Sequence, residues 1–108
     1  MATDKSFVEF IADQIENAGQ ITFKKMFGEY AVYCEGKVVA LVCDNQLFIK
    51  PTEGGRAFIG DVVEAPAYPG AKPAFLIDAR LEDRQWVSDL IKITYHELPE
   101  QKIKKKRK

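Results

Sequence analysis

Apolar residues near the start of the chain recur at intervals of three or four positions, the spacing of an amphipathic helix. The residues at these positions are Phe7, Phe10, Ile11, Ile15 and Ala18. Thr3 or Asp4 is the expected cap of this helix, and a capping box from Ser6 to Glu9 is the competing start. We expect Gly19 to end the helix.

Short strand-like segments follow the helix. The first begins at Ile21 and can extend to Phe27, where Gly28 would permit a bend. Three more, at 30–34, 38–43 and 46–50, are separated only by Glu35-Gly36-Lys37 and Asp44-Asn45. Links this short predict an antiparallel meander.

The predicted meander has two faces. With two-residue turns, the expected pairs are Tyr30 with Leu41, Leu41 with Phe48, Tyr33 with Val38, and Val42 with Leu47. One face has no charge and is the expected core: Ala31, Tyr33, Val38, Ala40, Val42, Leu47 and Ile49. The other face holds Tyr30, Val32, Cys34, Val39, Leu41, Cys43, Gln46, Phe48 and Lys50.

This second face is too apolar for a surface that meets only water. We therefore expect it to be covered, either by another protein or by the loop between Val62 and Pro73. The residues predicted to form an interaction face are Tyr30, Val32, Leu41, Phe48 and Lys50.

The second half of the chain predicts a short helix, a loop, a strand and a final helix. Residues 51–60 suggest a short helix that starts near Thr52 and is weakened by two glycines. Residues 62–72, rich in Pro, Gly and Ala, predict an ordered loop, and 74–77 a last strand. Asp83 should cap the final helix, and Pro99 follows its end. Its apolar stripe consists of Trp86, Val87, Leu90, Ile91, Thr94 and Leu98.

The pattern as a whole predicts an α+β domain of two layers. It has a leading helix, an antiparallel sheet of about five strands, a short crossing helix and a C-terminal helix. A chain of 108 residues is long enough for one core and too short for two ordinary domains. We expect one domain over residues 1–100 and a disordered basic tail over 101–108.

Charge is balanced over the chain but unevenly distributed. The sequence has 16 basic and 16 acidic residues, and residues 102–108 contain six of the basic ones. Residues 1–101 therefore carry a net charge of −6, which argues against a domain built to grip phosphates. The tail is the candidate for weak, sequence-independent contact with nucleic acid, through Lys102, Lys104, Lys105, Lys106, Arg107 and Lys108. The alternative is a solvated end that aids solubility.

The two cysteines and the hydropathy pattern indicate a soluble protein of a reducing compartment. Cys34 would lie at a turn and Cys43 at the far end of the returning strand, roughly 20–30 Å apart. A disulfide needs Cα atoms within about 7 Å, so we expect two free, buried thiols. The chain has no apolar run long enough to span a membrane and no signal-peptide pattern at its start. We expect a cytoplasmic location.

Candidate catalytic chemistry is sparse. His96 is the only histidine, which excludes a site with several histidine ligands, and neither cysteine is expected beside it. Gly54-Gly55 lacks the Gly-Lys-Ser/Thr ending of a phosphate-binding loop. Asp78, Glu82 and Asp83 are close together in the sequence, but Asp83 is needed as a helix cap. We therefore expect no catalytic activity, no cofactor and no metal.

One sequence pattern resembles a known family. Lys25-Met26-Phe27-Gly28-Glu29-Tyr30 is followed by Tyr33, Gly36-Lys37, Ala40-Leu41-Val42 and Leu47-Phe48-Ile49-Lys50. This series resembles the signature of the TfoX N-terminal domain family, over roughly residues 5–98. The family pattern usually has Met-Phe-Gly-Gly-Tyr, so Glu29 is a departure from it.

The resemblance implies a curved antiparallel sheet with a leading and a C-terminal helix, related to the secretion-chaperone-like architecture. It also implies a link to transcriptional regulation, because full-length members of the family regulate competence for DNA uptake. In those members a separate C-terminal helical domain follows. This chain is expected to be a stand-alone first domain, so the regulatory role transfers only weakly.

Three functions remain open from the sequence. The first is a non-catalytic regulatory or adaptor domain that acts through protein contacts, with homodimerisation through the second sheet face as one form. The second is a nucleic-acid-associated protein that uses the tail with Lys24 and Lys25. The third is a small-molecule sensor with a pocket between sheet and loop, lined by Tyr30, Phe48 and Tyr68.

Overall fold

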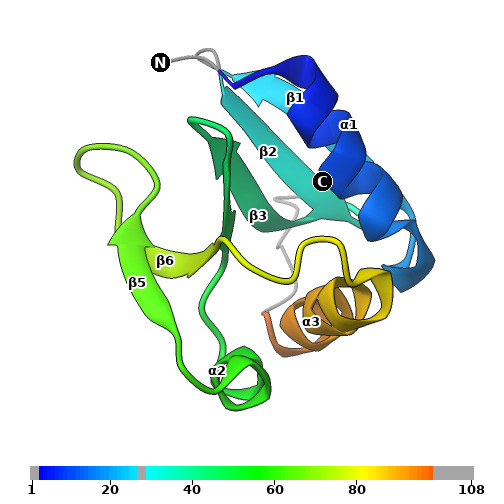
Figure 1. The fold of residues 1–108 in the computed structure, drawn as a ribbon, viewed down its shortest axis with the longest axis vertical. Coiled ribbons are helices and arrows are strands. Elements are labelled where there is room, and N and C mark those ends of the chain that lie inside the picture. The colour runs from blue at the N-terminus through cyan, green and yellow to red at the C-terminus, as the bar shows by residue number, and fades with distance from the viewer. Residues whose placement is uncertain (1–2, 27–28, 99–108) are drawn as a thin grey trace, which may run out of the picture.

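The computed structural model describes residues 3–26 and 29–98 of the chain (Figure 1). Within them, four consecutive strands and a later pair of strands are separated and flanked by helices. The elements are α1 (Lys5–Gln14), a 3-10 turn (Glu16–Ala18), β1 (Ile21–Met26), β2 (Glu29–Cys34), β3 (Lys37–Cys43), β4 (Gln46–Ile49), α2 (Glu53–Ile59), β5 (Val63–Pro66), β6 (Pro73–Ile77) and α3 (Arg84–Glu97).

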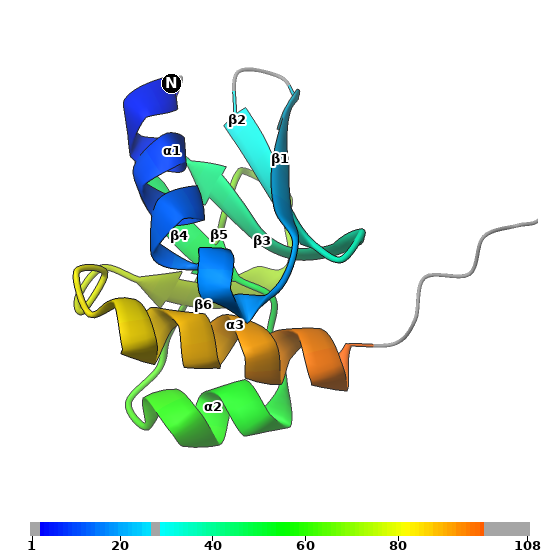
Figure 2. The same cartoon turned by 90° about the vertical axis from the view of Figure 1, so that its right-hand side faces the viewer.

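The strands form one antiparallel sheet in the order β1-β2-β3-β4-β6-β5. Helices α1 and α3 lie over the same face of this curved sheet, and α2 packs on the outer side of α3 (Figure 2). The predicted fold class, α+β with a leading helix and a C-terminal helix, is confirmed. The sheet has six strands in the described residues where about five were expected.

The core lies between the sheet and helices α1 and α3. All of its central residues are apolar and buried: Val8, Ile11, Ile15, Tyr30, Val32, Cys34, Val39, Ala40, Val42, Leu47, Ile49, Phe75, Ile77, Val87, Leu90 and Ile91. The helical spacing of the first and last helices therefore predicted the correct faces. Phe10 is the exception, because its side chain is 38% exposed.

A register shift in the sheet overturns part of the predicted face assignment. Tyr30 pairs with Val42, not with Leu41 as predicted, whereas the pair Tyr33 and Val38 is correct. Between these pairs Val39 is an extra residue on β3, so this strand has a β-bulge. The bulge shifts the alternation of side chains by one position along β3. The predicted pairs from β3 to β4, Leu41 with Phe48 and Val42 with Leu47, are confirmed.

One further prediction, for residues 62–72, was wrong. Val63–Pro66 forms the edge strand β5, although residues 62–72 were expected to be a loop throughout. Proline is tolerated there because the outer side of an edge strand needs no backbone donor. At the start of α1, Asp4 is the cap residue, one of the two expected caps, and the competing start at Ser6 is not used.

One of the two glycines of α2, Gly54, allows this helix to approach α3 closely. Thr52 caps α2 by accepting a hydrogen bond from the Gly55 amide at 2.9 Å. The Gly54 amide donates to Glu97 at 2.9 Å, and a Cβ atom at Gly54 would lie 2.9 Å from Cγ2 of Ile93. Gly54 weakens the intrinsic helix propensity of α2, but it also makes the close packing on α3 possible.

Candidate functional site

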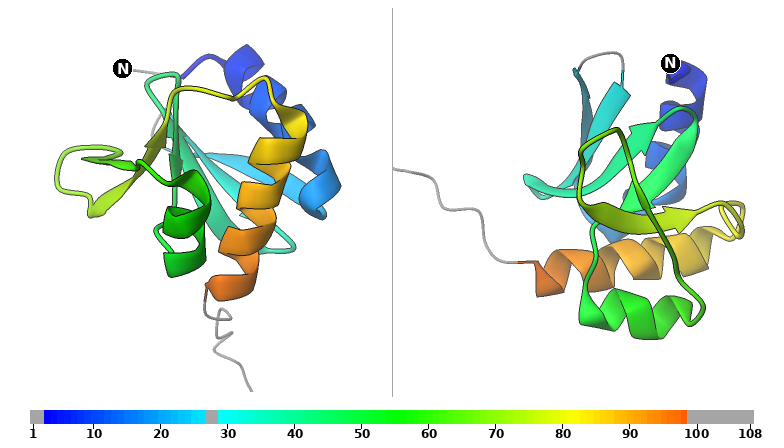
Figure 3. Two further views of the ribbon diagram at one scale, coloured as in Figure 1. Left: turned by 60° about the horizontal axis from the view of Figure 1, so that its bottom comes forward. Right: turned by 90° about the vertical axis from the view of Figure 1, so that its left-hand side faces the viewer.

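The sheet face opposite α1 and α3 is only partly covered. The register across β2, β3, β4, β6 and β5 places Ala31, Leu41, Phe48, Leu76 and Val63 in one row on this face. We call its accessible apolar part the open face: Tyr33, Val38, Leu41, Val63, Ala65 and Leu76. In the right-hand view of Figure 3 the loop between β5 and β6 passes in front of the strands, and α1 lies behind them.

The β5–β6 loop and the open face enclose a groove of about 490 Å³, which we call the loop groove. It is lined by Leu41, Phe48, Lys50, Pro51, Tyr68, Gly70, Ala71, Lys72, Pro73 and Ala74. Phe48 forms part of its wall and is 4% exposed, whereas Tyr68 on the loop is 54% exposed. The loop therefore covers part of the second face. This agrees with one of the two covers expected from the sequence, the loop between Val62 and Pro73.

The structure divides the residues of the predicted interaction face into two groups. Leu41, Phe48 and Lys50 line the loop groove. Tyr30 and Val32 lie in the core beneath the helices, so their predicted place on the second face was wrong. The physical reason is the bulge at Val39, which places Tyr30 and Val32 on the same face as Ala40 and Val42. Tyr30 likewise does not line the pocket predicted with Phe48 and Tyr68.

The residues predicted to contact nucleic acid lie mostly outside the described residues. The tail residues Lys102, Lys104, Lys105, Lys106, Arg107 and Lys108 all lie outside them. Phe27 and Gly28 of the family motif, which were not predicted to contact nucleic acid, also lie outside the described residues. Lys24 and Lys25 are exposed on β1. Lys24 pairs with Ala31 and so belongs to the second face, whereas Lys25 pairs with Tyr30.

Both cysteines are free and buried, as predicted. Burial raises the pKa of the Cys43 thiol to about 11, with smaller contributions from the nearby carboxylates of Glu29 and Asp44. Burial also raises the pKa of Cys34, against a smaller lowering by Lys37. A nucleophilic or metal-binding cysteine needs the thiolate, so these environments favour inert thiols. No cluster of His, Cys, Asp and Glu suited to a metal occurs in residues 3–26 and 29–98.

Glu29, the departure from the family pattern, secures the turn between β3 and β4. Its carboxylate accepts hydrogen bonds from the Asp44 amide at 3.0 Å and from the Thr3 hydroxyl. The Thr3 hydroxyl in turn accepts from the Asn45 amide at 3.2 Å. Asp44 and Asn45 have φ angles of 55° and 57°, values that need such local support in residues other than glycine. The carboxylate at position 29 is thus explained by a structural role.

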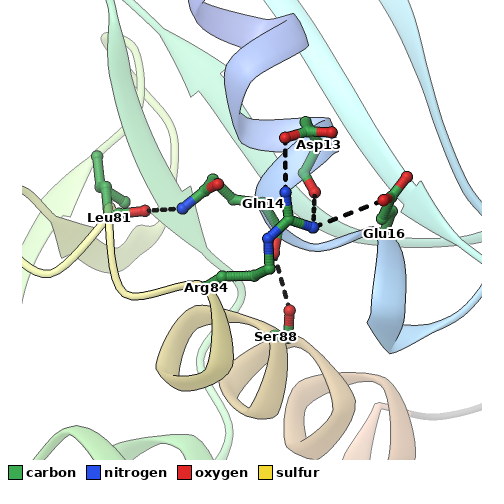
Figure 4. A network of polar contacts seen from close by, with 6 residues as sticks. All are labelled: Asp13, Gln14, Glu16, Leu81, Arg84 and Ser88. Carbon is green, nitrogen blue, oxygen red and sulfur yellow. Dashed lines mark hydrogen bonds and ion pairs between the residues drawn. The ribbon is translucent and has the colours of Figure 1, made fainter.

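The densest polar cluster joins α1 to α3 (Figure 4). Arg84 donates to the carbonyl and the carboxylate of Asp13, both at 2.8 Å, and forms an ion pair with Glu16 at 3.5 Å. The Gln14 amide donates to the Leu81 carbonyl, and the Ser88 hydroxyl donates to the Gln14 carbonyl, each at 2.8 Å. These groups satisfy one another between two helices, so the cluster is a packing contact.

Fold and surface together define a class: a small α+β domain whose helices cover one face of a bulged antiparallel sheet. The other face carries an apolar groove under a loop. The sequence profile of the TfoX N-terminal domain matches residues 13–98. The chain therefore belongs to the TfoX N-terminal domain family.

A curated relative has a similar length. It is the "Uncharacterized 12.7 kDa protein in trpE 5'region" of Spirochaeta aurantia, which is 39% identical over 105 residues. The match covers 97% of this chain and 91% of that protein. In the described residues, no helix is both long and apolar enough to cross a membrane.

Proposed function

We propose that this domain is a non-catalytic regulatory or adaptor domain that acts by binding another protein through the open face. The observation that carries the proposal is the placement of the helices. Both helices that pack on the sheet, α1 and α3, cover one face, and the opposite face keeps accessible apolar side chains. Val63 on the edge strand β5 is the most exposed of them, at 54%. Contiguous apolar surface of this kind is typical of protein-binding sites.

The membership in the TfoX N-terminal domain family supports a regulatory role. We include in the proposal a link to transcriptional regulation of competence, which the family resemblance implies. The partner of the open face is a protein, and a second copy of this chain is the first partner to test.

Sedimentation of the full chain over a wide concentration range tests the contact. A charge placed on the open face, Leu76→Glu or Val63→Glu, should weaken self-association, since a buried charge without a partner opposes an apolar contact. Gln85→Glu adds the same charge at an exposed position of α3 and should leave association unchanged.

Photo-crosslinking in cells tests a contact with a different protein. A benzoyl-phenylalanine at Val63 should give one discrete adduct that is lost on Leu76→Glu, while the same probe at Gln85 should give none. A chain that stays monomeric and gives no adduct from Val63 would refute the proposal. For the regulatory part, Leu76→Glu should reproduce the transcript changes of a gene deletion, and Gln85→Glu should not.

A further inference from the structure

The loop groove combines an apolar wall with two cationic side chains. Its volume of about 490 Å³ lies within the roughly 300–1,000 Å³ range of small-molecule sites. We propose that the loop groove binds a small amphipathic carboxylate, a molecule with an apolar aromatic or aliphatic body and one anionic head. This site goes beyond the proposed protein contact and does not depend on it.

Two aromatic rings form part of the apolar wall of the loop groove. Phe48 comes from β4, in the middle of the sheet, and Tyr68 comes from the loop that passes over it. Pro73 and Ala74 add apolar surface at the start of β6. The Tyr68 side chain is 54% exposed, so a ligand body seated beside Phe48 would remove apolar surface of the tyrosine from water.

Lys50 and Lys72 supply the positive charge of the loop groove. Lys50 follows the last residue of β4, and Lys72 precedes the first residue of β6, so they enter the groove from two segments. Neither lysine forms an ion pair or a side-chain hydrogen bond within the part of the chain that the structure describes. Every other residue that lines the groove is uncharged.

This local charge is opposite to that of the domain. Residues 1–101 carry a net charge of −6, yet the groove presents two lysines and no acid. Charge complementarity therefore selects an anion, and the surrounding apolar surface selects one with a hydrophobic body. An inorganic anion alone would leave Phe48 and Tyr68 unused, and a neutral apolar molecule would leave both lysines unused.

A matched pair of probes tests the proposal with the full chain: 2-naphthoate and its neutral counterpart, 2-naphthalenemethanol. In an amide NMR titration, naphthoate should cause saturable shifts at Phe48, Tyr68 and Ala71. The alcohol should bind the same residues more weakly, by roughly two- to fivefold for each lysine lost as a partner.

Three variants separate the contributions of the lysines and of Tyr68 to ligand binding. Lys50→Gln and Lys72→Gln should each weaken naphthoate binding by roughly two- to fivefold and leave the alcohol unaffected. Tyr68→Ala should weaken both probes. Lys24→Gln, on the same sheet side but outside the groove lining, is the matched control and should change neither.

Each variant must retain the wild-type pattern of amide shifts away from the groove. Tyr68, Lys50 and Lys72 are all exposed, so their substitution should leave the fold intact. The proposal is overturned if naphthoate shows no saturation, if its shifts map away from the groove, or if acid and alcohol bind equally.

Discussion

Lys37 provides the clearest test of how this fold holds its C-terminal helix. Its ammonium donates hydrogen bonds to the carbonyls of Tyr95 at 3.0 Å and Leu98 at 2.9 Å. It also lies 4.3 Å from the centre of the Tyr95 ring. Carbonyls of a last helical turn have no partner within the helix, and a cation there also favours the helix dipole. A side chain from the first residue of β3 thus caps the end of α3.

We expect Lys37→Met to lower the free energy of unfolding by about 2 kcal/mol, because the methionine keeps the apolar stem and removes the charge. Hydrogen bonds from a charged donor contribute roughly 1.5–3 kcal/mol each, and partial exposure of Lys37 reduces this. A loss of about 2 kcal/mol corresponds to a Tm lower by roughly 10 °C for a domain of this size.

Urea unfolding followed by the fluorescence of Trp86 measures the change, since this is the only tryptophan and it packs on Phe58 in α2. Lys92→Met is the control, because Lys92 is exposed on α3 and forms no polar side-chain contact within the described residues. Hydrogen exchange should also accelerate at the amides of the last turn of α3 in Lys37→Met alone. Equal stability of the two variants would refute the capping role.

Four further predictions concern the helices and thiols. Ser88→Ala should lower stability by about 1–2 kcal/mol in urea unfolding, because the Gln14 carbonyl loses its buried donor; an unchanged midpoint would contradict this. Asp83→Ala should lower the free energy of unfolding by about 1 kcal/mol through loss of the α3 cap, and Asp83→Asn should retain most of the stabilisation by the cap. Ellman's reagent should react with Cys34 and Cys43 only after unfolding. The pKa of Cys43 is raised to about 11 in the folded protein, so on raising the pH the thiol ionises first in the unfolded chain. Ionisation of the unfolded chain favours unfolding, so the free energy of unfolding should fall from about pH 8.5 toward pH 11. Cys43→Ala should show a smaller decline, and identical profiles would argue against a raised pKa.

Apart from β5, the order of the elements could be predicted from the sequence, because the spacing of apolar residues and the turn residues agreed. Helical periodicity identified α1 and α3, and the cap at Asp83 placed the start of α3 correctly. Glu35-Gly36 and Asp44-Asn45 predicted the two tight turns, and Gly36 and Asn45 indeed have positive φ angles. Caps, turns and helical periodicity depend on residues that are close together in the sequence, so the sequence alone reveals them.

The faces of β2 and of the start of β3 could not be predicted, because the bulge leaves no trace in the sequence. Residues 38–43 are apolar without interruption, so an extra residue at Val39 changes no visible alternation. The loop groove was foreseen only through Phe48 and Tyr68. Lys72, which supplies one of its two charges, was not singled out, because its proximity to Lys50 depends on the pairing of β4 with β6.

The strand order also has a consequence for the route by which the chain folds. β1 to β4 each pair with their neighbour in sequence, so these pairings close loops of only a few residues and lose little chain entropy. β6 is different, because it pairs with β4 although α2 and β5 lie between the two strands in the sequence. Contacts distant in sequence slow folding, so the meander should form first and the docking of β6 should set the rate. The loop groove, which needs both parts, is then completed in the last step of folding.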